Sequence, residues 1–218
     1  MSMDIFTLPG CDYDSNIYVI PGEYPTVIDT GTGFHSQKIL KEIQKIVKGK
    51  KIQQILLTHE HYDHVGGVQH ILQATDDLPR VFAHNDVVQK LKEGKSTFAE
   101  MLGGVMPCIQ VDVALIEGSQ ITIGDNTFDV LLTPGHSIGS LCFYSKNTGA
   151  LISGDTVFSH GGFGRFDFPG GDFNLLVRSI ERLAALNVRH LYPGHGPIVE
   201  ECGKDHVASS LLNIRSMI

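Results

Sequence analysis

The chain has 218 residues, 42% of them apolar, so it can bury a sizeable core and is not predominantly disordered. The 24 acidic residues outnumber the 17 lysines and arginines, which gives a formal net charge of −7. Because a net acidic chain repels phosphate backbones, we expect no nucleic-acid partner. No stretch approaches the roughly 18 apolar residues of a membrane span, and no basic region precedes an apolar one at the N-terminus. We therefore expect a cytoplasmic protein with no membrane partner.

Short strands and helices alternate in the first half of the sequence. Strands are expected at 5–8, 17–20, 26–28, 52–57 and 80–83. Helices are expected at 36–47, 65–72 and 86–91, and in the first of them Ile39, Leu40 and Ile43 recur at helical spacing. Residues 93–104 contain three glycines and no clear period, which indicates a loop over the site or a surface excursion.

The second half is rich in hairpins and ends in two helices. Strands are expected at 120–123, 127–132, 140–144, 150–152 and 189–192. A helix should begin after Asp172, a good N-cap residue, and run to about Leu186, and a last helix should cover 205–214. Two halves of this kind predict an α/β fold, an αββα sandwich of two mixed sheets with helices outside. We expect a single domain over residues 1–218.

One pattern recurs four times along the chain. An apolar strand runs into a short polar turn that ends in a potential metal ligand, namely His59, His136, Asp155 and His195. Side chains at strand ends are fixed by the buried sheet and stay open on one side, which preorganises a site.

The densest part of this pattern is the turn at 58–67, which places three histidines and Asp63 within six residues. Neutral imidazole together with carboxylate suits zinc or iron. A polar loop that is merely rich in histidine does not account for the matching strand-end ligands downstream. A zincin HExxH site is excluded because Asp63 stands where that motif requires its second histidine.

The motif His-x-His-x-Asp-His, followed by His136, Asp155 and His195, resembles the metallo-β-lactamase superfamily. The flanking segments at 133–140, 153–158, 164–172 and 193–197 look like its glyoxalase II (hydroxyacylglutathione hydrolase) branch. The resemblance covers about residues 15 to 200 and implies the metallo-β-lactamase fold. A cysteine takes the place of Asp155 in the commonest class of zinc β-lactamases, which argues against antibiotic hydrolysis.

The resemblance also implies two divalent metal ions, zinc in the first place, with iron or manganese as alternatives. It assigns the first ion to His59, His61 and His136. It assigns the second ion to Asp63, His64 and His195, with Asp155 bridging both. Asp29 matches an acid that supports the ligands from behind, and an ordinary turn aspartate is the alternative.

Two further residues are expected at the substrate. Arg165 matches the family's residue for the glutathione carboxylate, and pairing with Asp167 or Asp172 on the surface is the alternative. Phe163 either lines a substrate mouth or packs in the core. Asp167 and Pro197 stand where the branch has tyrosines, so the thiol carrier need not be glutathione.

We therefore expect a dinuclear-metal hydrolase, a thioesterase of the hydroxyacylglutathione hydrolase type that acts on a small-molecule thioester. Asp63 would orient a metal-bridging hydroxide and hold its proton. A thiolate with a pKa near ~8.5 leaves without a strong acid, which favours thioesters over amides. The alternatives are a mononuclear-iron persulfide dioxygenase and a lactonase or phosphodiesterase on the same metals. The acyl group, the thiol and the oligomeric state stay open.

Overall fold

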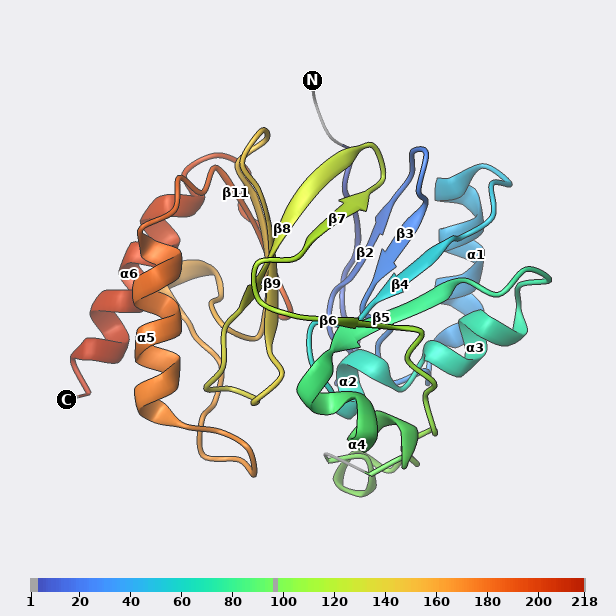
Figure 1. The fold of residues 1–218 in the computed structure, drawn as a ribbon, viewed down its shortest axis with the longest axis horizontal. Coiled ribbons are helices and arrows are strands. Elements are labelled where there is room, and N and C mark those ends of the chain that lie inside the picture. Colours follow the sequence, from blue (N-terminus) through green and yellow to red (C-terminus); the bar gives the residue numbers. More distant parts are fainter. Residues whose placement is uncertain (1–3, 96–97, 218) are drawn as a thin grey trace.

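Two β-sheets lie face to face at the centre of the molecule, and helices cover the outer face of each sheet (Figure 1). The structure is a computed structural model that describes residues 4–95 and 98–217. Its layer order confirms the predicted αββα sandwich.

The first sheet is mixed and has six strands in chain order. They are β1 (Phe6–Leu8), β2 (Ile17–Ile20), β3 (Thr26–Ile28), β4 (Gln54–Leu56), β5 (Arg80–His84) and β6 (Val113–Leu115). Strands β1 to β3 pair antiparallel, whereas β3 to β6 pair parallel. The carboxyl ends of β3, β4 and β5 therefore meet at one edge. The sequence analysis did not predict β6.

The second sheet has five strands in the order β11-β10-β9-β8-β7. Their bounds are β7 (Gln120–Ile123), β8 (Asn126–Leu132), β9 (Leu141–Ser145), β10 (Ala150–Gly154) and β11 (His190–Pro193). Strands β7 to β10 pair antiparallel, and β10 pairs with β11 in parallel. All five strands lie within two residues of their predicted positions.

Six α-helices complete the layers within the described ranges. They are α1 (Ser36–Val47), α2 (Tyr62–Val65), α3 (Val68–Gln73), α4 (Val88–Lys92), α5 (Phe173–Ala184) and α6 (Gly203–Arg215). Short 3₁₀ turns lie at η1 (Asn85–Val87), η2 (Glu100–Leu102) and η3 (Ser159–Gly161). As predicted, Asp172 caps α5, since its side chain accepts a hydrogen bond from the backbone N–H of Leu175 at 2.9 Å.

The helix predicted at 65–72 was wrong in its extent. The structure has two helices there, and the first begins at Tyr62, inside the ligand-rich turn. The break falls at Gly66 and Gly67, where a Cβ on Gly67 would lie 2.2 Å from the carbonyl oxygen of Thr30. The turn thus packs directly against the loop after β3, which a longer side chain would prevent.

Alternate residues of the strands face different cores, so both sheets are buried on both faces. In β2, Ile17 and Val19 face the helices, whereas Tyr18 faces the other sheet. In β9, Cys142 packs toward α5 and α6, whereas Phe143 packs between the sheets. Strands held on both faces give rigid ends, and the predicted ligands lie just beyond those ends.

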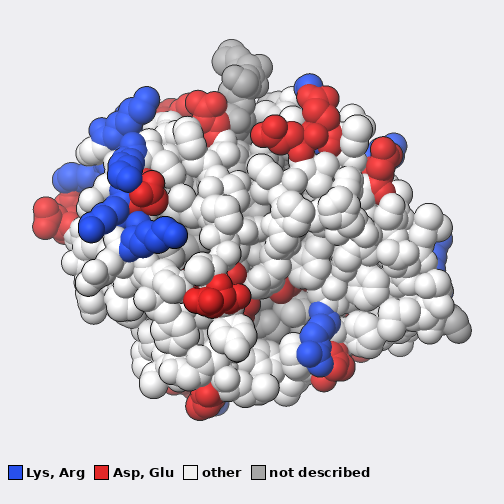
Figure 2. Space-filling view, turned by 180° about the vertical axis from the view of Figure 1, so that it is seen from behind, with Lys and Arg blue, Asp and Glu red and all other residues white. Residues whose placement is uncertain are grey.

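The surface carries its lysines unevenly. On the face shown in Figure 2, lysine and arginine gather mainly at the left edge, which is the α1 side of Figure 1. In α1 and just after it, two lysines are paired on the surface, Lys45 with Glu42 and Lys51 with Asp77. Within the described ranges, no helix has the length and apolar character needed to cross a membrane.

Candidate metal centre

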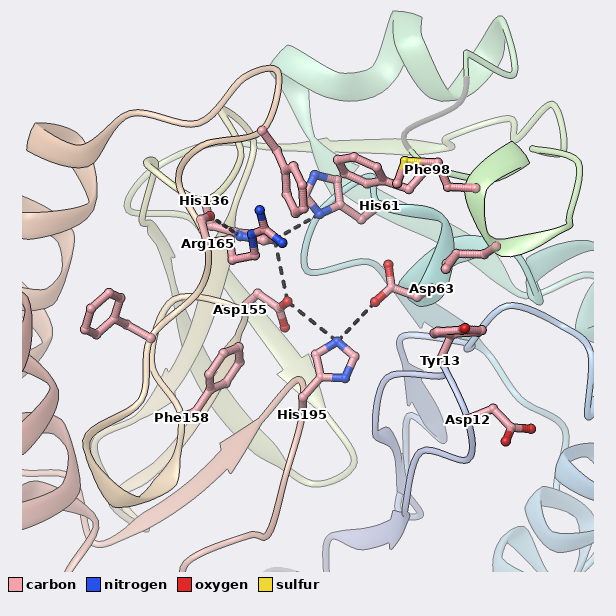
Figure 3. Close-up of a pocket in the computed structure, with 14 residues that line it drawn as sticks. Asp12, Tyr13, His61, Asp63, Phe98, His136, Asp155, Phe158, Arg165 and His195 are labelled. Carbon is pink, nitrogen blue, oxygen red and sulfur yellow. Dashed lines mark hydrogen bonds and ion pairs between the residues drawn. The ribbon is translucent and has the colours of Figure 1, made fainter.

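The structure brings all seven predicted ligands together at one edge of the sandwich, where strands of both sheets end. Figure 3 shows His61, Asp63, His136, Asp155 and His195 of this set. They lie in four short segments. The turn after β4 and α2 supply His59, His61, Asp63 and His64, and the turns after β8, β10 and β11 supply His136, Asp155 and His195.

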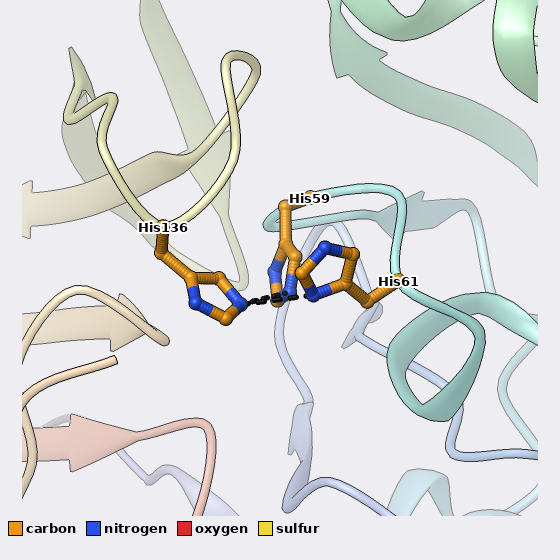
Figure 4. Close-up of side chains that lie close together, drawn as sticks. All are labelled: His59, His61 and His136. Carbon is orange, nitrogen blue, oxygen red and sulfur yellow. Dashed lines mark hydrogen bonds between the residues drawn. The ribbon is translucent and has the colours of Figure 1, made fainter. Parts of the chain in front are cut away.

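The first group of ligands consists of three buried histidines, His59, His61 and His136 (Figure 4). His136 Nε2 lies 3.2 Å from His59 Nε2 and 2.9 Å from His61 Nδ1. Two nitrogens on one tetrahedral zinc, each at about 2.0–2.1 Å, would lie about 3.3 Å apart. The three nitrogens therefore converge as they would around a single ion.

The second group consists of Asp63, His64 and His195. His195 Nε2 lies 3.1 Å from Asp63 Oδ2, and His64 Nε2 lies 3.6 Å from the same oxygen. This group is less buried than the first, because the His195 side chain is 36% exposed and the Asp63 side chain is 19% exposed.

Asp155 lies between the two groups. Its Oδ1 is 3.3 Å from His64 Nε2, while its Oδ2 is 3.5 Å from His136 Nε2 and 3.6 Å from His195 Nε2. One carboxylate therefore faces ligands of both groups, which is the placement that a bridging ligand requires.

Three buried atoms of the ligand cluster have no hydrogen-bond partner within the described residues: His61 Nε2, His64 Nε2 and Asp155 Oδ1. The last two face each other at 3.3 Å. Buried polar atoms are nearly always paired, so an unmade bond there points to a bound water or ion. A divalent cation between His64 Nε2 and Asp155 Oδ1 would satisfy both atoms, so the residues present fit a metal.

The charges of the two groups differ. Burial lowers the pKa of His59 well below its usual value, and burial together with His136 lowers the pKa of His61 to about 4. Both rings are therefore neutral at pH 7, as metal ligands must be. Burial alone would raise the pKa of Asp155, but His64 and His195 outweigh it and hold that pKa well below the usual range.

The second group is the acidic one. Although burial opposes it, the carboxylates of Asp155 and Asp29 raise the pKa of His64 well above its usual value. Asp155 and Asp63 likewise raise the pKa of His195 against its burial. The region therefore holds an excess of negative charge that favours a cation.

Asp29 lies behind the ligands, as the sequence suggested. Its Oδ2 is 2.8 Å from His64 Nδ1 and accepts a hydrogen bond from Thr58 Oγ1 at 2.8 Å, while its Oδ1 accepts one from the Thr58 backbone N–H at 2.9 Å. The backbone of Asp29 is left-handed, with φ 58°, which aspartate tolerates better than most residues. The contact directs the Nδ1 proton of His64 to Asp29 and leaves Nε2 facing the centre.

His136 is oriented by a backbone group that the sequence analysis missed. Its Nδ1 lies 2.6 Å from the carbonyl oxygen of Arg165, so the N–H donates to this carbonyl and Nε2 faces the centre. The loop approaches this closely because residue 164 is glycine. A Cβ there would lie 1.9 Å from the Asp155 carbonyl oxygen.

Glu60, between two of the ligand histidines, turns away from the centre. It is buried, lies 2.7 Å from Lys90 Nζ and accepts a hydrogen bond from the Ser137 hydroxyl. This contact ties the ligand-rich turn to the turn that carries His136. One feature of the sequence could have indicated this orientation. Glu60 lies between His59 and His61, and neighbouring residues of an extended turn point to opposite sides.

A pocket of about 430 Å³ opens above the ligands (Figure 3). His61, Asp63, His136, Asp155 and His195 are among the residues that line it. Its other lining residues are largely apolar: Tyr13, Phe98, Met101, Leu102, Phe158, Phe163 and Phe168, with Asp12 and Arg165 beside them.

The substrate residues expected from the sequence line this pocket. Phe163 does so and also packs against the core of the second half. Arg165 does so too, but its Nε and one terminal nitrogen bind the Asp167 carboxylate at 2.9 and 2.6 Å. The loop at 93–104 lies over the site through Phe98, Met101 and Leu102, and its residues 96–97 lie outside the described ranges.

Residues 12–195 match the family model described as "Metallo-beta-lactamase superfamily". The chain is 36% identical to a "probable metallo-hydrolase" of Bacillus subtilis, over 83% of both chains. It is 27% identical to the hydroxyacylglutathione hydrolase GloC of Haemophilus influenzae, over 98% of this chain and 100% of the relative. It is 28% identical to the atrochrysone carboxyl ACP thioesterase of Aspergillus fumigatus, over 85% of this chain and 52% of that protein.

Two solved structures share this fold over at least 90% of the chain. The crystal structure of the B3 metallo-beta-lactamase BLEG-1 has a TM-score of 0.79 at 28% identity and covers 90% of this chain and 93% of its own. The crystal structure of TTHA1623 in a di-iron-bound form has a TM-score of 0.75 at 32% identity and covers 95% of this chain and 96% of its own.

Proposed function

The chain belongs to the metallo-β-lactamase superfamily, whose members bind divalent metal ions, and we propose that it is a dinuclear-metal thioesterase. Relatives described as metallo-hydrolases indicate metal-dependent hydrolysis. The thioester as substrate, two ions per chain and zinc as the native metal belong to the proposal. Relatives described as an ACP thioesterase and as a hydroxyacylglutathione hydrolase support the choice of a thioester.

One observation carries the proposal: two groups of ligands share Asp155 at the bottom of an open pocket. A structural zinc site is closed by four protein ligands, whereas a catalytic site keeps a position for water or substrate. Here Asp63 and His195 belong to the second group and also face the pocket. The arrangement therefore offers substrate access to the region between the two groups.

The chemistry divides between the bound ions and the side chains around them. When bound, divalent cations polarise a carbonyl oxygen and lower the pKa of water toward about 7. Asp63 is the carboxylate of the second group that faces the pocket, where it can accept a hydrogen bond from an attacking water and hold its proton. Asp29 and the Arg165 carbonyl keep His64 and His136 in the required tautomers.

The leaving group favours a thioester. A thiolate, with a pKa near ~8.5, can leave without protonation, whereas an amine needs a general acid. Asp63 and Asp155 carry no proton to give to an amine at neutral pH: His64 and His195 outweigh the opposite effect of burial and lower the pKa of both carboxyl groups.

Iron is the alternative metal with a specific observation behind it, because TTHA1623, at 32% identity, was solved in a di-iron-bound form. Metal-free protein should be loaded separately with zinc and with iron(II), and assayed with a thioester, a lactone, a phosphodiester and a persulfide. We expect thioester hydrolysis to be the fastest reaction. Oxygen uptake with the persulfide in place of thioester hydrolysis would overturn the proposal in favour of a dioxygenase.

A further inference from the structure

The pocket has apolar walls on both sides of the metal-binding floor. Phe98, Met101 and Leu102 come from the loop after α4, and Phe158, Phe163 and Phe168 come from the loop between β10 and α5. These two loops belong to opposite halves of the chain, so both halves contribute apolar surface to the same cavity.

Phe98 and Phe168 join the two walls directly. Their ring centroids lie 4.1 Å apart, and both rings stand edge-on to His61, at 5.3 and 6.5 Å. The backbone of Phe98 is left-handed, with φ 70°, which is rare for an aromatic residue and typical of positions held for function. The aromatic pair therefore stands beside the place where a substrate carbonyl would react.

The charged groups beside the pocket are already paired. Arg165 binds Asp167, and its guanidinium carbon lies 4.1 Å from the centre of the Phe168 ring. Asp12 Oδ2 lies 3.0 Å from His35 Nε2. A substrate must break these contacts to use either charge, whereas the apolar walls are available without rearrangement.

Apolar surface continues to the edge of the pocket. The exposed fraction is 79% for Met101 and 60% for Tyr13, although both line the cavity. Exposed apolar groups that continue a cavity are typical of ligand grooves. A long ligand would cover them.

We propose that this pocket selects thioesters whose acyl group is apolar and longer than acetyl, in contact with Phe98 and Met101 of one loop and with Phe163 and Phe168 of the other. This inference rests on the proposed thioesterase function, and it makes the acyl group rather than the thiol the main determinant of specificity. The aromatic rings would exclude water from the acyl chain, while the ligand cluster faces the thioester carbonyl.

The test is an acyl series on one thiol. The metal-loaded protein is given the acetyl, butanoyl, hexanoyl and 2-hydroxypropanoyl thioesters of N-acetylcysteamine. One fully buried methylene favours binding by a factor of about four. Because the pocket is open on one side, we expect kcat/KM to rise about 10- to 100-fold from acetyl to hexanoyl, and the 2-hydroxypropanoyl thioester to stay near acetyl.

Two methionines provide a matched pair of variants. Met101→Gln should lower the ratio of hexanoyl to acetyl turnover about threefold, whereas Met217→Gln, at an exposed methionine beyond α6, should leave the ratio unchanged. Both side chains are more than half exposed, so neither change threatens folding. Phe98→Ser should lower the ratio further, with circular dichroism as the check on folding. Equal ratios in all variants would overturn the assignment of these walls.

Acyl selection and thioesterase activity can be refuted by different results. If all four thioesters are hydrolysed at similar rates, acyl selection is overturned and the thioesterase stands. If none is hydrolysed, the thioesterase falls, and calorimetry with ketone analogues, in which a methylene replaces the sulfur, decides the pocket. Binding of the hexanoyl analogue at least about tenfold tighter than the acetyl analogue would sustain an apolar acyl site, and equal binding would overturn it.

Discussion

The two ligand groups of this centre are built differently. The first consists of three buried histidines, and its His136 is oriented by a backbone carbonyl. The second combines Asp63 with His64 and His195, is partly exposed and lies in a region of excess negative charge. Neutral, buried ligands hold an ion mainly through their fixed geometry. The second group also relies on the electrostatic attraction between its carboxylates and the cation. The first ion should therefore be held firmly, whereas the second should exchange more easily and lie nearer the substrate.

Asp155→Ala should have the largest effect because it removes the carboxylate that faces both groups. We expect most of the second metal to be lost and thioester hydrolysis to fall by about 10³-fold, since a metal ion supplies several kcal/mol of transition-state stabilisation. Metal analysis and steady-state kinetics measure both. Asp76→Ala, at an exposed aspartate that does not line the pocket, is the control. Retained activity with two bound ions would show that Asp155 is misassigned.

His195→Ala tests the difference between the groups most simply. It should reduce the metal content from two ions to one and leave the first group loaded, because no ligand of that group is touched. His61→Ala should instead remove the firmly held ion. A stepwise titration with a chelator, followed by metal analysis, should show two phases in the wild-type protein and one in His195→Ala. Simultaneous loss of both ions from every protein would remove the distinction between the groups.

Asp29→Asn tests the support behind the second group. Asparagine tolerates the left-handed backbone at this position, so the change mainly removes the charge that faces His64. Loss of such an outer partner costs about 10- to 100-fold in metal affinity or activity. We expect this loss for the second ion only, measured by competition with a chelating dye. Equal weakening of both ions would mean that Asp29 supports the turn as a whole.

Glu60→Gln should affect stability and leave the metal content unchanged. Glu60 is buried and paired with Lys90 and Ser137, away from the ligand cluster. Weakening these contacts should lower the free energy of unfolding by about 1–3 kcal/mol, measured by urea denaturation at fixed metal concentration. Glu93→Gln, at an exposed glutamate paired with Lys95, should change little. Loss of a metal ion from Glu60→Gln would place this side chain in the centre.

The smallest effect is expected at Arg165, which the sequence analysis assigned to an anionic substrate. Because Arg165 already binds Asp167, Arg165→Ala should raise KM for a carboxylate-bearing thioester by no more than about threefold, as befits an exposed ion pair. Asp167→Asn frees the guanidinium and should lower the same KM. A much larger effect of Arg165→Ala, absent with a neutral analogue, would restore anion selection as the main role of Arg165.

The ligand cluster could be anticipated from the sequence because its chemistry lies in side chains at the ends of apolar strands. His136, Asp155 and His195 each follow a glycine at or shortly after the end of such a strand, and the buried sheets bring these ends to one edge. Asp29 could be anticipated from its place after β3, but its contact with His64 depends on a left-handed backbone that the sequence does not reveal.

Other features had no sequence signal of that kind. The carbonyl of Arg165 orients His136 through a backbone atom, which any residue would supply. The apolar wall at Phe98 and Met101 lies in a segment without a period, so sequence alone could not separate a loop over the site from a surface excursion. The break between α2 and α3 follows from close packing of Gly67 against Thr30, a contact distant along the chain.

The number of zinc ions bound per chain decides whether this centre is dinuclear. Metal-free protein should be saturated with zinc, freed of excess metal by gel filtration and analysed for zinc and protein, with thioester hydrolysis recorded on the same sample. We expect two ions per chain and hydrolysis that rises as the second ion binds. One ion per chain at saturation, with His195→Ala binding as much zinc as the wild type, would contradict it.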